Sequence, residues 1–141
     1  MTSQVRSHTP AQIFALAFGV VYLFIGLVGF AVTGFDNFAG SAVDEKLLLF
    51  PVNPLHNLVH IAVGGLWLVA SARHATARSV NVAIGITYAL VAALGFAGVL
   101  KFLAIAGAGS ADNWLHLVTA VVSLYFGTAG ATATRATNAT I

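Results

Sequence analysis

Cysteine is absent from this chain, and charged residues are scarce. The absence of cysteine excludes disulfides, thiolate metal ligands and thiol catalysis. Only 7% of the 141 residues are charged, whereas a soluble domain carries about 25%. The few basic residues are scattered and form no patch or stripe, so we expect no nucleic-acid partner.

Most of the chain is apolar. Hydrophobic residues make up 59% of the chain and the mean hydropathy is +0.93, which is typical of an integral membrane protein. About 20 helical residues cross the hydrocarbon core of a bilayer. Four stretches satisfy this length, namely residues 11–33, 54–72, 80–103 and 112–132. The sequence therefore predicts an all-α membrane protein in a lipid bilayer, a four-transmembrane-helix bundle formed as a single domain by residues 1–141.

The charges between the apolar stretches predict the orientation of the bundle. One side carries four arginines and no acidic residue: Arg6, Arg73, Arg78 and Arg135. The opposite side carries mixed charges: Asp36, Asp44, Glu45, Lys46, Lys101 and Asp112. Because cytoplasmic loops are enriched in Lys and Arg, we expect a multi-pass protein of the plasma (inner) membrane with both termini in the cytoplasm.

The two halves of the chain share a pattern. Three residues of the first stretch recur in the third at a constant spacing of 66, pairing Gly19 with Gly85, Tyr22 with Tyr88 and Gly29 with Gly95. Two residues of the second stretch recur in the fourth at a spacing of 56, pairing Asn57 with Asn113 and His60 with His116. Both helical hairpins start on the same side, so the pattern predicts two parallel-repeat hairpins related by a pseudo-two-fold axis along the membrane normal.

Polar and ionisable residues open the second and fourth stretches. They are His56, Asn57, His60, Asp112, Asn113 and His116. Residues four apart share a helix face, and ionisable groups inside a membrane face a bundle interior or a wet cavity. We therefore expect these six side chains to form a polar cluster at the extracytoplasmic end of the bundle, beneath the connection made by residues 34–52.

Three interpretations of this polar cluster stay open at the level of sequence. In the first, its side chains hydrogen-bond across the bundle, fix the helix register and need no cofactor. In the second, His56, His60, His116 and Asp112 bind a divalent metal ion, because imidazole and carboxylate suit Zn²⁺ and several related ions. In the third, His60 and His116 are the axial ligands of a b-type haem.

Aromatic residues receive structural roles, and no catalytic residue is predicted. Tyr22 and Tyr88 lie on inward-facing stripes, where each is expected to pack and make a local hydrogen bond. Trp67 and Trp114 are expected to anchor the bundle at opposite membrane interfaces. No serine has a visible His-and-acid context for nucleophilic catalysis, and no phosphate-binding motif occurs.

Two segments and a loop carry a resemblance to a known family. The segments are Asn53-Pro54-Leu55-His56-Asn57-Leu58-Val59-His60 and Ala111-Asp112-Asn113-Trp114-Leu115-His116-Leu117, and the loop is residues 34–40. They resemble a family of small four-helix membrane proteins that is common in actinobacteria and is catalogued as a domain of unknown function. The resemblance extends over nearly the whole chain and implies fold and membrane location, without an activity.

Taken with the small size of the chain, these features favour a non-enzymatic accessory or assembly subunit of a larger membrane complex. Its partners would be other membrane protein subunits or further copies of itself. The alternative is a metal- or haem-binding membrane protein that uses the polar cluster.

Overall fold

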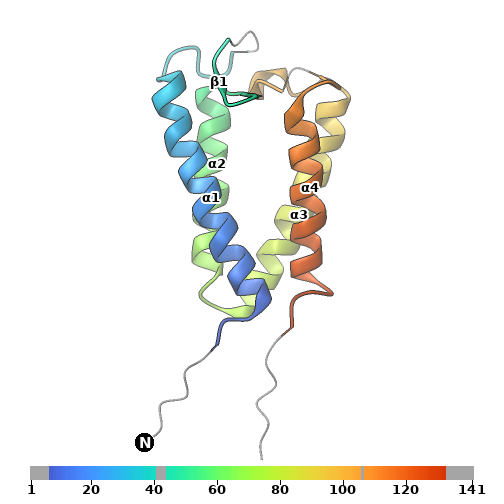
Figure 1. Ribbon diagram of the computed structural model, residues 1–141. Helices are drawn as coiled ribbons and strands as arrows, with labels where there is room; N and C mark the ends of the chain where they lie inside the picture. Colours follow the sequence, from blue (N-terminus) through green and yellow to red (C-terminus); the bar gives the residue numbers. More distant parts are fainter. Residues whose placement is uncertain (1–6, 41–43, 106, 133–141) are drawn as a thin grey trace, which may run out of the picture.

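The computed structural model describes residues 7–40, 44–105 and 107–132. Within these residues the chain forms four α-helices, a two-stranded hairpin and a short 3-10 helix. They are, in order, α1 (Pro10–Thr33), β1 (Lys46–Leu47), β2 (Phe50–Pro51), α2 (Pro54–Ala70), α3 (His74–Phe96), η1 (Lys101–Leu103) and α4 (Ala111–Gly127). Figure 1 shows two helical hairpins, α1–α2 and α3–α4, standing side by side, with β1–β2 and η1 covering the same end.

Local sequence explains where the first two helices begin. Thr9 forms a capping box with Gln12 ahead of α1, which satisfies backbone N–H groups that have no partner within the helix. Asn53 caps α2, with its Oδ1 accepting from the backbone N–H of His56 at 2.8 Å. A proline follows each cap, since the first helical turn does not need its N–H.

Three of the expected helix boundaries are wrong. The third helix begins at His74 rather than near residue 80, because the polar residues after Arg73 already wind into its first turns. It ends at Phe96 rather than near residue 103, where the chain turns through Gly98 at a φ of +74°. Helix α4 ends at Gly127 rather than near residue 132. Helices α1 and α2 agree with expectation to within two residues at each end.

The lengths of the helices bear on the membrane prediction. Among the described residues, α1 with 24 residues and α3 with 23 are long and apolar enough to cross a membrane. Helix α2 is apolar but has 17 residues, and α4 also has 17, at the lower limit for a span. The structure thus supports two candidate spans directly, and the four-span arrangement stays a prediction.

The two hairpins use the same close contacts. A methyl group added at Gly19 would lie 2.9 Å from Cγ of Leu68, and one added at Gly85 would lie 2.7 Å from Cγ of Leu124. These pairs obey the spacings of 66 and 56 residues found in the sequence. Small residues of this kind let helix backbones approach closely, and each hairpin depends on them at the same level.

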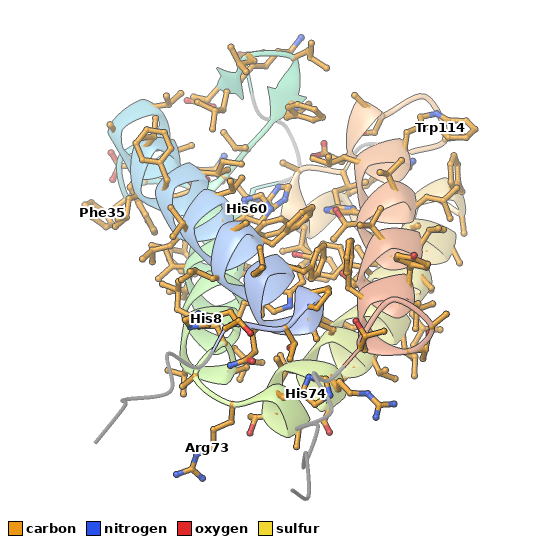
Figure 2. All side chains as sticks on the ribbon, turned by 60° about the horizontal axis from the view of Figure 1, so that its bottom comes forward. His8, Phe35, His60, Arg73, His74 and Trp114 are labelled. Atoms are coloured by element: carbon orange, nitrogen blue, oxygen red, sulfur yellow. The ribbon has the colours of Figure 1, made fainter. Side chains whose placement is uncertain are left out.

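The expected role of Trp67 is wrong. Its side chain is 0% exposed and its Nε1 donates to Oδ1 of Asn81 at 3.0 Å. The indole lies in the core rather than at the surface because Asn81, buried on α3, satisfies its N–H. Trp114, in contrast, is 60% exposed. Figure 2 shows it pointing outward with Phe35 and Arg73, while His60 lies between the helices.

Candidate metal centre

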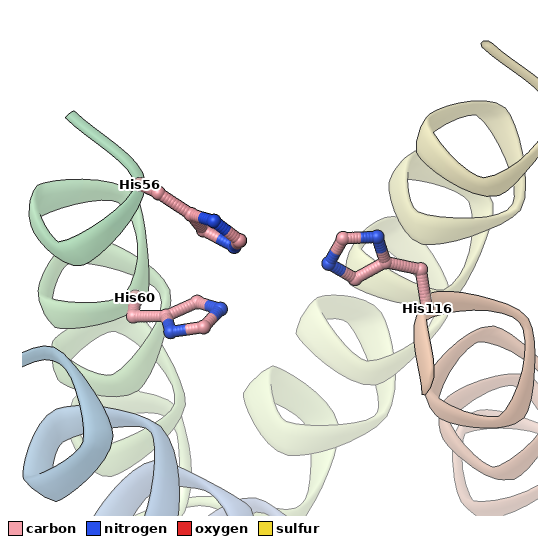
Figure 3. Close-up of side chains that lie close together, drawn as sticks. All are labelled: His56, His60 and His116. Carbon is pink, nitrogen blue, oxygen red and sulfur yellow. The ribbon is translucent and has the colours of Figure 1, made fainter. Parts of the chain in front are cut away.

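Helices α2 and α4 bring three histidines together between the two hairpins. His56 and His60 come from α2, and His116 comes from α4. Figure 3 shows the three rings pointing toward one another. One ring nitrogen from each side chain lies within 4.8 Å of those of the other two. Helix spacing accounts for the pair on α2, and the packing of the hairpins brings His116, which the sequence places in the same predicted cluster, next to them.

The position of each ring follows from its helix. His56 and His60 are four residues apart, so they lie one above the other on one face of α2, with ring centroids 4.6 Å apart. The Asn53 cap fixes the turn that carries His56. The His116 ring lies 6.1 Å from that of His56. The group is therefore divided between the two hairpins.

All three rings are removed from water and incompletely paired. Their side chains are only 3%, 6% and 3% exposed for His56, His60 and His116. The Nδ1 atom of each is buried and finds no hydrogen-bond partner among the described residues. A buried polar atom without a partner costs about 1–3 kcal/mol. Each ring also brings one nitrogen to the group of three, and neutral imidazole nitrogen is a common metal ligand.

Two tyrosines support two of the rings. The ring of Tyr22 on α1 meets that of His60 at 5.1 Å and 69°, and the ring of Tyr88 on α3 meets that of His116 at 5.2 Å and 70°. The two contacts have nearly the same geometry because Tyr22 and His60 correspond to Tyr88 and His116 in the repeat. The Tyr22 hydroxyl pairs with Oγ1 of Thr119 on α4 at 2.9 Å, which is a bond to the other hairpin rather than the expected local one. The tyrosines thus contact the histidines through ring edges and faces and limit how far the imidazoles can turn.

The two asparagines of the predicted cluster are held away from the rings. Nδ2 of Asn57 donates to Oγ1 of Thr33 at 3.0 Å, and Nδ2 of Asn113 donates to the carbonyl of Gly107 at 2.8 Å. Each amide oxygen lies against a glycine of its own hairpin. Asn57 and Asn113 therefore tie helix ends to the neighbouring helix or loop, which is the structural role of the first interpretation.

Asp112, the fourth predicted metal ligand, does not belong to the three-histidine group. It is 2% exposed, and its Oδ2 accepts from Oγ of Ser110 at 3.1 Å. It lies in the first turn of α4, one turn before His116. The structure therefore unites three of the four predicted ligands and leaves the carboxylate beside them.

The haem interpretation conflicts with the position of His56. A bis-histidine haem places its porphyrin between the two axial nitrogens. The ligand atom of His56 lies within 4.8 Å of both His60 and His116, so the imidazole of His56 would overlap the porphyrin. The arrangement fits a single small ion better.

Sequence reasoning missed two polar residues that hold the hairpins together. Asn81 is 0% exposed; besides accepting from Trp67, its Nδ2 donates to the carbonyl of Ala11 at 3.2 Å. Asn53 caps α2 through its Oδ1, and its Nδ2 also donates to the carbonyl of Phe102 in the other hairpin at 2.8 Å. A lone asparagine within an apolar stretch was the available signal for Asn81.

The fold and the three histidines define a small helical bundle with a candidate metal centre between two repeated hairpins. Residues 12–129 match the family model described as Domain of unknown function (DUF4383), and the chain belongs to this family. The family predicted from the sequence motifs is thereby confirmed. No curated protein and no solved structure matches the chain.

Proposed function

We propose that this protein is an integral membrane protein that binds one divalent transition-metal ion between its hairpins, with His56, His60 and His116 as ligands. The observation that carries the proposal is the meeting of three buried imidazoles, each with an unpartnered Nδ1, within 4.8 Å of one another. Burial of polar ring nitrogens away from water is unfavourable, and an ion bound by one nitrogen of each ring would offset part of that cost.

The distribution of polar and apolar side chains supports a membrane location. Large apolar side chains cover the outside of all four helices, among them Phe24 (64% exposed), Val69 (75%), Leu90 (60%) and Val121 (60%). Within the described part of the chain, twelve polar or charged side chains are instead buried. Soluble proteins rarely expose large apolar patches, whereas polar groups inside a membrane face the bundle interior. We therefore take all four helices as spans, in two parallel-repeat hairpins.

The ligand set narrows the choice of metal. Imidazole nitrogens suit Zn²⁺, Cu²⁺, Ni²⁺ and iron. Cysteine is absent from the chain, so thiolate ligands are excluded. Two nitrogens bound to one Zn²⁺ at about 2.1 Å can be at most about 4.2 Å apart, so small rotations of the rings would close the present separation. Three protein ligands would leave a fourth position for water, as in zinc sites that are open to solvent.

Purified protein in detergent provides the first test. After treatment with a chelator, Co²⁺ is titrated as a coloured substitute for Zn²⁺, and bound metal is counted by elemental analysis. We expect one ion per chain and visible absorption that is lost in His60→Ala. His8→Ala is the matched control, since His8 is exposed at the other end of the bundle, and it should bind as the unmodified protein does. Absence of bound metal, or equal binding by His60→Ala, would contradict the proposal.

The accessory or assembly role expected from the sequence stays a prediction. The exposed apolar side chains could contact either lipid or a protein partner, so they do not favour the assembly role. An assembly subunit could also bind a metal ion, so the assembly role and metal binding do not exclude each other.

A further inference from the structure

Asp112 is a buried carboxylate whose negative charge lacks an evident partner. Its side chain is 2% exposed, and the group that donates to its Oδ2 is the neutral hydroxyl of Ser110. Among the described residues no lysine or arginine acts on this carboxylate. Burying an unpaired charge is expensive, so a carboxylate retained at such a place calls for a nearby cation.

The three-histidine group, in contrast, lacks negative charge to balance a bound cation. Three neutral imidazoles leave a divalent ion with its full double positive charge. The cost of moving an ion out of water is several kcal/mol and is recovered only with good charge compensation. Among the residues that the structure describes, no carboxylate belongs to the group. A metal centre at this position therefore needs an anion close by.

The fold places the anion and the cation site next to each other. Asp112 lies four residues before His116 on α4, and side chains at that spacing are neighbours, with Cβ atoms about 5–6 Å apart. The repeat gives a second argument, because the spacing of 56 residues pairs Asp112 with His56. Asp112 thus occupies the position in the second hairpin that carries a ligand in the first. Aspartate is shorter than histidine, so its carboxylate ends farther from the shared centre.

From this juxtaposition we propose that Asp112 balances the charge of the bound ion from outside its first coordination shell, and accepts a hydrogen bond from a water molecule in the fourth coordination position. The inference rests on the metal centre proposed above. Carboxylates just outside the ligand shell orient what the metal binds, and their loss typically weakens metal binding about 10- to 100-fold.

The test compares Co²⁺ binding by the full-length protein and by Asp112→Asn in detergent. We expect the variant still to bind one ion per chain with an unchanged absorption spectrum, and its Kd to rise about 10- to 100-fold. Asp36→Asn removes an exposed carboxylate from the same end of the bundle, and its Kd should stay within about twofold of the unmodified value. Thermal unfolding of each protein without metal shows that it is folded.

Ser110→Ala provides a milder variant, since it removes the hydroxyl that donates to Asp112, and a smaller rise in Kd supports the inference if Asp112→Asn does not fold. An unchanged Kd in both variants would overturn it. So would loss of the absorption bands or of bound metal in Asp112→Asn, because that result would make Asp112 a direct ligand. If the unmodified protein binds no Co²⁺, the metal centre itself is wrong, which is a distinct result.

Discussion

At the scale of single residues, the unusual feature is that polar side chains are concentrated where apolar helices pack most tightly. Asn57, Asn81 and Asn113 are 0% exposed, and each donates from its amide to a neighbouring helix or loop. Asn57 and Asn113 also leave one buried atom, Oδ1, without a partner, as the histidines leave Nδ1. The asparagines nevertheless join neighbouring segments through their amide donors, whereas the three histidines lie with their ring nitrogens close to one another.

The bond between Trp67 and Asn81 gives a prediction about stability. Asn81→Ala leaves the indole N–H of Trp67 and the carbonyl of Ala11 without their partner, which should lower the free energy of unfolding by about 1–3 kcal/mol. A double-mutant cycle with Trp67→Phe should give a coupling energy of about 0.6–2 kcal/mol for the pair. Unfolding in a graded series of denaturing and mild detergents measures these values.

Thr87→Ala is the control for this cycle. Thr87 lies on the same helix, is exposed, and bonds only within its own helix, to the carbonyl of Ala83. Its replacement should change the free energy of unfolding by no more than about 0.5 kcal/mol. A coupling energy near zero between Trp67 and Asn81 would show that their hydrogen bond adds no stability.

The residue scale also shows what the sequence could not provide. The spacing of His56 and His60 predicted their shared helix face, but the addition of His116 depended on how the hairpins pack. Trp67 was expected at an interface because the sequence does not show which N–H acceptor lies across the bundle. Asp112 was expected as a fourth metal ligand, and spacing alone could not show that its carboxylate lies outside the three-histidine group.

At the scale of helices, close packing in each hairpin depends on glycine at particular levels. Gly64 and Gly65 are neighbours on α2 but have opposite surroundings. A Cβ at Gly64 would meet the backbone of Leu23 on α1 and lie 2.9 Å from the carbonyl oxygen of Gly19, whereas a Cβ at Gly65 would have no atom within 4 Å. The two positions therefore form a matched pair for testing the packing.

Gly64→Ala should force α1 and α2 apart and destabilise the bundle by about 1–3 kcal/mol, the usual range for overpacking. Gly65→Ala should leave stability unchanged or raise it slightly, because alanine favours the helix by up to about 1 kcal/mol. Thermal unfolding of the two variants in the same detergent compares them directly. Equal midpoints would contradict the tight α1–α2 contact.

The helices were more predictable than their ends. Long apolar stretches indicated all four α-helices, since hydropathy reflects the side chains that face outward. The start of α3 was wrong because residues from His74 onward are polar yet helical, and hydropathy does not register a polar first turn. Its end was wrong because the chain leaves the helix at Gly98 and then folds back through η1, although its sequence stays apolar.

At the scale of the whole molecule, the two hairpins are similar but their pseudo-symmetry is broken at both ends. The spacing of 56 residues pairs Trp67 with Ser123, so one hairpin fills its share of the core with an indole and the other with a small hydroxyl. Phe14 packs against Trp67 and Phe126, with ring centroids 5.8 and 4.9 Å apart. Aromatic rings thus fill the end near the α2–α3 turn, and the histidines lie toward the opposite end. We expect an ion to enter and leave from the histidine side, without crossing the bundle.

The orientation of the molecule gives the last prediction, and the absence of cysteine makes it simple to test. Single cysteines at Asp44, Ala75 and Gly109 would each be exposed in a loop or at a helix start. If all four helices span the membrane with the Arg73 and Arg78 side in the cytoplasm, a membrane-impermeant maleimide added to intact cells should label Asp44→Cys and Gly109→Cys. It should label Ala75→Cys only after lysis. Protection of Gly109→Cys in intact cells would mean that α3 and α4 do not cross as a pair. The three-histidine group would then not lie at an outer end shared by both hairpins.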